Sequence, residues 1–271
     1  MHMNTGAGPS FGNPPVVETV LSVQFDELRS FRTVHFGNYH ETVKDRFPIA
    51  EDRPRLEPVS ESFPRVPLRP TLQISPDSGS PGRVWFRDAV DGCLMLQLQP
   101  DRFAFNWCRR EGEDYPRYAS NQPRVIEEFN GFREFAACHG LGEVKPNLCE
   151  VTYVNHILPK EGETATECFA SVFSGIHWQS TDGWLPQPPE VVSLNRVFVI
   201  GDQKGRLYAE ASIANERTVG DLIGLKITAR VIHKDDDDLG ENLDLAHEWV
   251  VRSFVSLTEH QARHERWRQE S

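Results

Sequence analysis

The histidines and acidic residues of this chain are its candidate metal ligands. Their spacing argues against a metal site. His260 and His264 are four residues apart, which can present two ligands on one face of a helix. Their neighbours are Gln, Arg and Glu, so a solvated helix face is the simpler interpretation. The acidic run at residues 235–238 lacks the alternating spacing and central glycine of a calcium loop. We therefore expect no metal site and no cofactor.

Nucleophilic catalysis is not indicated by the sequence either. It contains no GxSxG elbow and no glycine-rich phosphate loop. Cys149 and His156 could form a Cys–His pair, but their odd spacing on one predicted strand points the side chains to opposite faces. Five cysteines without a CxxC pair indicate reduced thiols. We expect structural roles on strands for Cys93, Cys108, Cys149 and Cys168. The sequence does not decide whether the protein is an enzyme, but the absence of a recognisable catalytic motif argues against it.

Polar side chains on predicted strands are the remaining candidates for a binding site. Residues 93–110 are typical of a β-hairpin, because leucine and aromatic residues alternate with polar ones on either side of a turn at Pro100-Asp101. A polar residue on a strand must find hydrogen-bond partners or face water or a ligand, and both alternatives stay open here. The candidate binding residues are Gln97, Asp101, Arg102, Asn106, Trp107, Tyr115, Asn155, His156 and Arg230.

Several of these candidates have a specific structural alternative. Asp101 and Arg102 could simply lock the hairpin turn. Trp107 alternates with two phenylalanines, which favours a core position. Tyr115 belongs to the sequence YPRY, which could be an exposed interface loop or could pack across one end of the sheet.

The periodicity of apolar residues outlines the elements that would carry these side chains. Alternation predicts strands at residues 16–25, 83–88, 148–158, 191–200, 207–213 and 225–231, in addition to the hairpin. Spacings of three and four predict helices within residues 28–47, from Ser120 to Gly140, and over 243–267.

The connections between these elements are less regular. Residues 48–70 are proline-rich and indicate either an ordered crossing with one edge strand or a flexible loop. Residues 72–74 would begin a strand, and residues 77–82 would form a turn. The polar stretch 159–167 is the candidate hinge between two halves, and residues 168–178 open the second half.

The elements together indicate an α+β fold with a mostly antiparallel sheet. Two related β-meander halves would each be followed by an amphipathic helix packed on one face of the sheet. We divide the chain into a flexible leader (1–12), an N-terminal half (13–160) and a C-terminal half (161–271), the two halves forming one continuous unit. The opposite, polar face of the sheet would be open to water or used for binding.

Composition and charge restrict the classes of partner. The chain has 271 residues and a formal net charge of −11, which disfavours nucleic acid because phosphate binding needs a basic surface. No apolar run approaches the roughly 18 residues that would span a bilayer, so we expect no membrane partner. The N-terminus lacks the pattern of a secretory signal. We therefore expect a cytoplasmic protein.

Four phrases resemble those of one protein family. They are NPPVVETVLSVQF, LQLQPDRFAFNW followed by YPRY, CEVTYVNHI, and LDLAHEWVVRSFVSLT followed by His and Trp. In this order they resemble a sporadically distributed family of bacterial and archaeal proteins that has no established activity. The resemblance covers residues 13–267. It implies accessory genes on mobile islands, which would fit a defence or interbacterial system.

Two functions follow as alternatives. The first is a non-enzymatic binding or interaction protein that is accessory to a larger system, with an unknown protein partner and with homodimerisation left open. The alternative is a helix-grip-like domain that binds a small ligand or acts as an enzyme. The alternative requires an apolar pocket between the C-terminal helix and the sheet, and a solid core there would exclude it.

Overall fold

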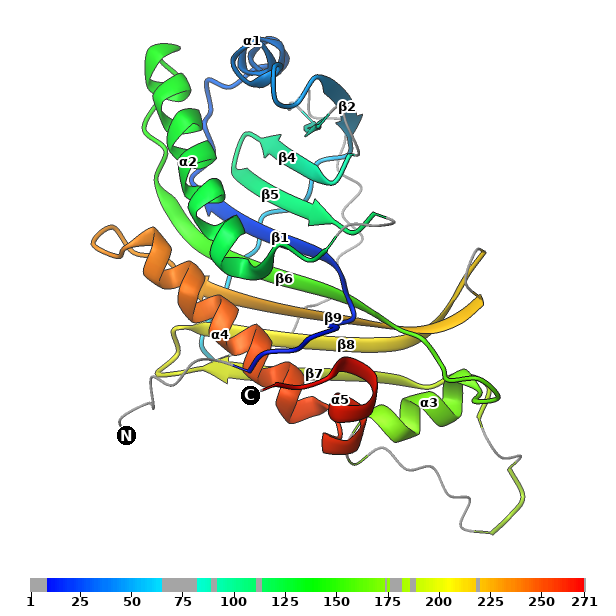
Figure 1. Cartoon of the computed structure of the whole chain (residues 1–271). Helices are drawn as coiled ribbons and strands as arrows, with labels where there is room; N and C mark the ends of the chain where they lie inside the picture. Colours follow the sequence, from blue (N-terminus) through cyan, green and yellow to red (C-terminus); the bar gives the residue numbers. More distant parts are fainter. Residues whose placement is uncertain are drawn as a thin grey trace.

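The computed structural model describes residues 9–64, 82–88, 92–110, 114–173, 175, 182–185, 189–217 and 220–270. Within this part of the chain, one antiparallel sheet has the strand order β2-β3-β4-β5-β1-β6-β9-β8-β7 (Figure 1). The strands are β1 (Val16–Phe25), β2 (Ile49–Arg53), β3 (Arg83–Arg87), β4 (Leu94–Gln99), β5 (Arg102–Cys108), β6 (Pro146–Ile157), β7 (Ser193–Ile200), β8 (Gly205–Glu216) and β9 (Gly220–Ile232). The helices are α1 (Thr33–Val43), α2 (Arg117–Cys138), α3 (Ala165–Val172), α4 (Leu239–Leu257) and α5 (His260–Trp267).

The strand order repeats itself about the centre of the sheet. One series runs β1, α1, β2-β3-β4-β5 and α2, and the other runs β6, α3, β7-β8-β9 and α4, so β2 is an extra edge strand of the first series. β1 and β6 pair at the centre, with Leu21 opposite Val151, and each series extends outward from that pair. The predicted α+β fold with an antiparallel sheet is confirmed. By topology the second series begins at β6, ahead of the division expected at residue 161.

The two long helices lie across the same face of the sheet (Figure 1). α2 buries Phe129 and Phe132 against Phe25 and Phe103, with ring centroids 5.6–6.1 Å apart. α4 packs on β6 and β9 and buries a stripe of smaller side chains: Leu243, Ala246, Val250, Ser253 and Phe254. None of the described helices has the length and apolar character needed to cross a membrane.

The predicted helix over 243–267 is two helices. α4 begins after Asp238, whose carboxylate accepts a hydrogen bond from the Glu241 N–H at 2.9 Å. It ends at Thr258, which is extended and bridges to Phe173 at the end of α3. Because this bridge takes the backbone of Thr258 out of the helical conformation, the chain restarts as α5.

The start of the predicted segment 168–178 is also different in the structure. Residues 165–172 form α3, and Cys168 is a buried helical residue rather than a strand residue. Thr164 and Glu167 form a reciprocal capping box, a four-residue pattern that is visible in the sequence and signals the start of a helix. Residues 174 and 176–178 lie outside the described part, as do the predicted strand at 72–74 and most of the turn at 77–82.

Residues 9–12, which we expected in a flexible leader, are ordered. They pair with the C-terminal residues: the Gly12 N–H donates to the Arg268 carbonyl at 3.1 Å, and the Glu270 N–H donates to the Ser10 carbonyl at 2.9 Å. Phe11 is buried and meets the ring of Phe254 edge-on at 5.3 Å. We call residues 9–16 the N-terminal wall. Residues 1–8 of the expected leader are outside the described part.

Part of the polar face of the sheet is covered by residues 54–64, which we call the strap. Its backbone exchanges hydrogen bonds with Gln99 at Leu56 and with Gln24 at Val59. Its Glu61 forms a buried ion pair with Arg206 of β8. The described part of the proline-rich segment 48–70 is therefore an edge strand, β2, followed by an ordered crossing, and residues 65–70 lie outside the described part. The prediction of a face open to water or used for binding does not hold where the strap lies, because the strap pairs with the polar groups there, but Glu210 and Ser212 of β8 are exposed on the same face.

Candidate functional site

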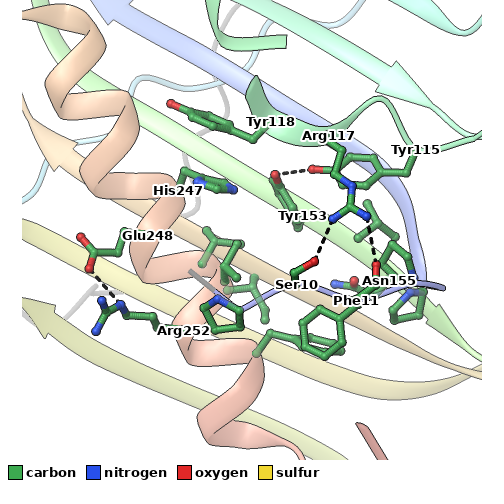
Figure 2. A pocket seen from close by; sticks show the side chains of 18 of the residues that line it. Ser10, Phe11, Tyr115, Arg117, Tyr118, Tyr153, Asn155, His247, Glu248 and Arg252 are labelled. Carbon is green, nitrogen blue, oxygen red and sulfur yellow. Dashed lines mark hydrogen bonds and ion pairs between the residues drawn. The ribbon is translucent and has the colours of Figure 1, made fainter. Parts of the chain in front are cut away.

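A cavity of about 570 Å³ lies between α4, the central strands, the start of α2 and the N-terminal wall (Figure 2). The N-terminal wall contributes Pro9, Ser10, Phe11, Pro14, Pro15 and Val16. The sheet contributes Tyr153, Asn155 and Ile227, and the start of α2 with the preceding loop contributes Tyr115, Arg117, Tyr118 and Ala119. α4 contributes His247, Glu248, Val250, Val251, Arg252 and Phe254.

Regular periodicities direct these side chains into the cavity. Tyr153 and Asn155 are two residues apart on β6, so they share one face of the strand. His247, Val251 and Phe254 are four and three residues apart on α4, so they share one face of the helix. The N-terminal wall closes the cavity because its pairing with residues 267–270 holds it across the gap.

Aromatic hydroxyls and one histidine supply polar groups to the cavity. The hydroxyls of Tyr115 and Tyr153 are 2.5 Å apart and share a hydrogen bond. The ring of Tyr118 stacks on His247 with centroids 3.8 Å apart and planes 6° apart. The Tyr118 hydroxyl donates to Asp244 at 2.8 Å. Figure 2 shows the tyrosine pair and the histidine around the same cavity.

Burial keeps these groups uncharged at neutral pH. Desolvation raises the pKa of Tyr115 to about 12 and raises the pKa of Tyr153 well above its ordinary value. Desolvation also lowers the pKa of His247 to about 4, so its imidazole is neutral. Within the described residues, neither ring nitrogen of His247 has a hydrogen-bond partner. The neutral ring can therefore offer one donor and one acceptor to a bound molecule.

Charged residues stand at the edge of the cavity. Arg117, the first residue of α2, has a left-handed φ of 42°, which is uncommon for a residue other than glycine. Its guanidinium donates to the Ser10 hydroxyl at 3.2 Å and to the Phe11 carbonyl at 3.4 Å. Glu248 and Arg252 form an ion pair at 2.9 Å on α4. Arg117 is thus held by two neutral oxygens.

Two of the predicted binding residues line the cavity. Tyr115 belongs there through its pair with Tyr153, so the YPRY loop packs inward rather than forming an exposed patch. Asn155 donates through its side-chain amide to the Leu225 carbonyl at 3.1 Å, and its side-chain oxygen has no partner in the described part of the chain. Trp107 is buried and supports the ring of Tyr115 at 5.4 Å.

The other predicted binding residues lie elsewhere, in hydrogen-bond and ion-pair networks. Gln97 donates to Asn106 at 2.7 Å, and Asn106 donates to Glu18 at 2.6 Å. Asp101 pairs with Arg55, and Arg102 donates to Gln24. Arg230 pairs with Glu150 at 2.6 Å, and His156 lies 3.6 Å from Glu216. The geometry brings none of these six residues to the cavity.

Sequence reasoning missed His247, Tyr153 and the N-terminal wall, and it considered Arg117 and Tyr118 only as members of the YPRY loop. The shared face of Tyr153 and Asn155 was available as a signal, because they are two residues apart on a strand. It also missed the actual neighbour of Cys149, which is His233 at 3.9 Å rather than His156. Burial raises the pKa of the Cys149 thiol to about 12, so this pair is not an activated nucleophile.

The described residues contain no group of three or more His, Cys, Asp or Glu side chains that could hold a metal ion. The cavity combines apolar walls, neutral hydrogen-bonding groups and, at its edge, Arg117 and the Glu248–Arg252 ion pair, an arrangement that can hold and orient a small molecule. No family model, curated protein or solved structure matches this chain, so the chemistry of the cavity rests on the residues described above.

Proposed function

We propose that this protein binds a small, largely apolar molecule in the cavity beneath α4. One observation carries the proposal: the space between the C-terminal helix and the sheet is a cavity of about 570 Å³ instead of a solid core. Sites for small molecules are typically concave, mostly apolar and about 300–1,000 Å³ in volume. The arrangement of a long helix over a curved antiparallel sheet is that of helix-grip domains, an analogy of fold only.

The polar groups favour recognition of a ligand. Hydroxyls that stay protonated and an imidazole that stays neutral can donate and accept hydrogen bonds without a change of charge. Ile227, Val250 and Val251 supply apolar surface in the same cavity, and Ile227 lies directly opposite Tyr153 where β6 pairs with β9. A ligand would therefore be oriented as well as held.

Native mass spectrometry of the freshly purified protein tests the proposal. The expected result is a mass above that of the denatured chain, and the difference identifies the bound molecule. Val251→Trp should fill the cavity and remove the extra mass. Ser256→Trp adds the same side chain at an exposed position of α4 and should retain it. The same extra mass in all three proteins would place the molecule outside the cavity, and no extra mass after exposure to a lipid extract would count against binding.

A second candidate function is docking of a protein partner at β7. This strand ends the sheet, and no described strand pairs with its outer edge. Phe198 and Val199 on it are 42% and 48% exposed, and Trp184 in the preceding loop is 82% exposed. Exposed apolar side chains beside an open strand edge are typical of interaction sites. The partner could be another protein or a second copy of this chain.

An interaction site at β7 would fit the role that the family resemblance implies. We also propose that the chain belongs to the sporadic bacterial and archaeal family, lies in the cytoplasm and has an accessory role in a mobile-island or defence system. Phe198→Lys with Val199→Lys should abolish partner capture or dimerisation while the cavity still binds its ligand. Size-exclusion chromatography with light scattering and a pull-down would measure this. Unchanged capture and unchanged oligomeric state would exclude β7 as the docking edge.

A further inference from the structure

We infer that the ligand of the cavity is an amphipathic acid, with its carboxylate at Arg117 and its apolar body between α4 and the sheet. This inference rests on the proposed function, since it names the class of molecule for the same cavity. Arg117, the tyrosine pair and His247 supply the polar contacts, and Ile227, Val251 and Phe254 supply the apolar ones.

Arg117 is the cation that lacks a carboxylate. Among the described residues, the hydrogen bonds of its guanidinium go to the Ser10 hydroxyl at 3.2 Å and to the Phe11 carbonyl at 3.4 Å. Across the described residues, no acidic side chain forms an ion pair with it. A guanidinium binds a carboxylate through two parallel hydrogen bonds, which are shorter and stronger than those to neutral oxygens. A ligand carboxylate would therefore be a better partner than the two oxygens it has now.

The tyrosine pair adds a donor next to this cation. In a hydrogen bond between two hydroxyls, one proton is used and the other is free to donate elsewhere. Both hydroxyls are protonated, so Tyr115 and Tyr153 together offer one unused O–H. The charge of Arg117 acts on Tyr115, which places the two groups in the same electrostatic environment. Figure 2 shows the guanidinium on the side of the cavity where the tyrosine hydroxyls meet.

Acidic groups around the cavity have other partners. Glu248 pairs with Arg252, and Asp244 accepts from the Tyr118 hydroxyl. Glu270 accepts from the Ser10 hydroxyl at 2.9 Å. The side-chain oxygen of Asn155 and one nitrogen of neutral His247 are acceptors, so a second polar group on the ligand could donate to them. The charge balance thus favours an anion over a cation at the Arg117 end.

The experiment compares an acid with the alcohol of the same chain. The neutral dye N-phenyl-1-naphthylamine is bound first, and dodecanoate or dodecanol displaces it. Arg117 is exposed, so its ion pair with a carboxylate is partly screened by water, and Arg117→Gln should weaken dodecanoate by about 2- to 5-fold and leave dodecanol and the dye unchanged. Arg117→Lys keeps the charge without the two-pronged geometry and should recover part of the affinity. Arg133→Gln, an exposed position far along α2, should change neither.

The outcomes separate this inference from the proposed function. If Arg117→Gln binds the dye but weakens acid and alcohol equally, or weakens neither, the carboxylate assignment is wrong and the cavity is still a binding site. If the wild-type protein binds neither the dye nor the two chains, the proposed function itself fails. Repeating the comparison with 2-naphthoate and 2-naphthylmethanol tells whether the body of the acid is planar or a flexible chain.

Discussion

The layers beneath α2 and α4 occupy corresponding places in the two series of elements, yet one is filled and the other is hollow. Under α2, the rings of Phe25, Phe103, Phe129 and Phe132 lie in mutual contact and are almost fully buried. Under α4, the stripe contains Ala246 and Val250, and the cavity lies beside it. The same architecture therefore gives a solid core or a binding site according to the size of the side chains between helix and sheet.

Side chains are packed less tightly in the hollow layer under α4 than in the filled layer under α2. A gap removes the partner atoms of the side chains around it, so an unfilled cavity forfeits dispersion contacts. The N-terminal wall closes this gap with backbone pairing to residues 267–270 instead of with bulky side chains. We interpret the open space as room that a ligand occupies.

The largest expected effect tests the filled layer. Phe132→Ala should lower the free energy of unfolding by about 3–5 kcal/mol, the usual cost of removing a buried phenyl ring. Its ring contacts those of Phe25, Tyr39 and Phe103. Urea denaturation measures the change. A loss below about 1 kcal/mol would show that this layer is not tightly packed and would break the comparison.

The opposite face of the sheet, closed by the strap, gives the next largest effect. Glu61→Gln should cost about 2–4 kcal/mol, because it leaves the buried guanidinium of Arg206 without its charge partner. Limited proteolysis should also cut residues 54–64 faster. If denaturation midpoints and cleavage rates stay at the wild-type values, the polar face is not held by this pair.

In the hollow layer, we expect protonation of His247 to destabilise the folded protein at acid pH. Its folded-state pKa is about 4, below the unfolded value near 6.5. The unfolded chain therefore binds the proton first, and stability is fully present above pH 6.5 and falls as pH drops towards 4. The loss should reach about 2–3 kcal/mol. Denaturation of wild type and His247→Phe from pH 7 to pH 4 measures the difference. Parallel pH profiles would mean that the imidazole is not desolvated.

The smallest effect is expected at the cavity wall. Val251→Ala removes two methyl groups that already face the cavity, so the free energy of unfolding should fall by less than about 1 kcal/mol. Affinity for the apolar dye should change more than stability does. A stability loss as large as that of Phe132→Ala would show that Val251 is packed as core, and the hollow layer would then be solid.

The sequence predicted local elements well because alternation reports burial directly. The strand at residues 16–25 and the hairpin at 93–110 follow from their own side chains. The sequence offered a pocket between the C-terminal helix and the sheet only as the alternative to an interaction protein. The cavity itself depends on Phe11 meeting Phe254 and on residues 9–13 pairing with 267–270, contacts between the two ends of the chain. No local period encodes such contacts.

The wrong predictions also result from contacts between residues that are distant in the sequence. Thr258 has no helix-breaking side chain, and its extended backbone follows from the bridge to Phe173. Gln97 and Asn106 alternate as solvent-facing residues would, but they are buried in a network that includes Arg83, Trp85 and Glu18. Only the tertiary structure shows whether the polar face of a strand is exposed to water or covered by other residues.

The most direct test of the hollow layer is a fluorescence titration with N-phenyl-1-naphthylamine, which brightens in apolar surroundings. Wild type, Val251→Trp and Ser256→Trp are titrated side by side. We expect one saturable site per chain in wild type and Ser256→Trp, and none in Val251→Trp, because only the first substitution fills the cavity. Equal binding by all three proteins, or none by wild type, would contradict a binding site beneath α4.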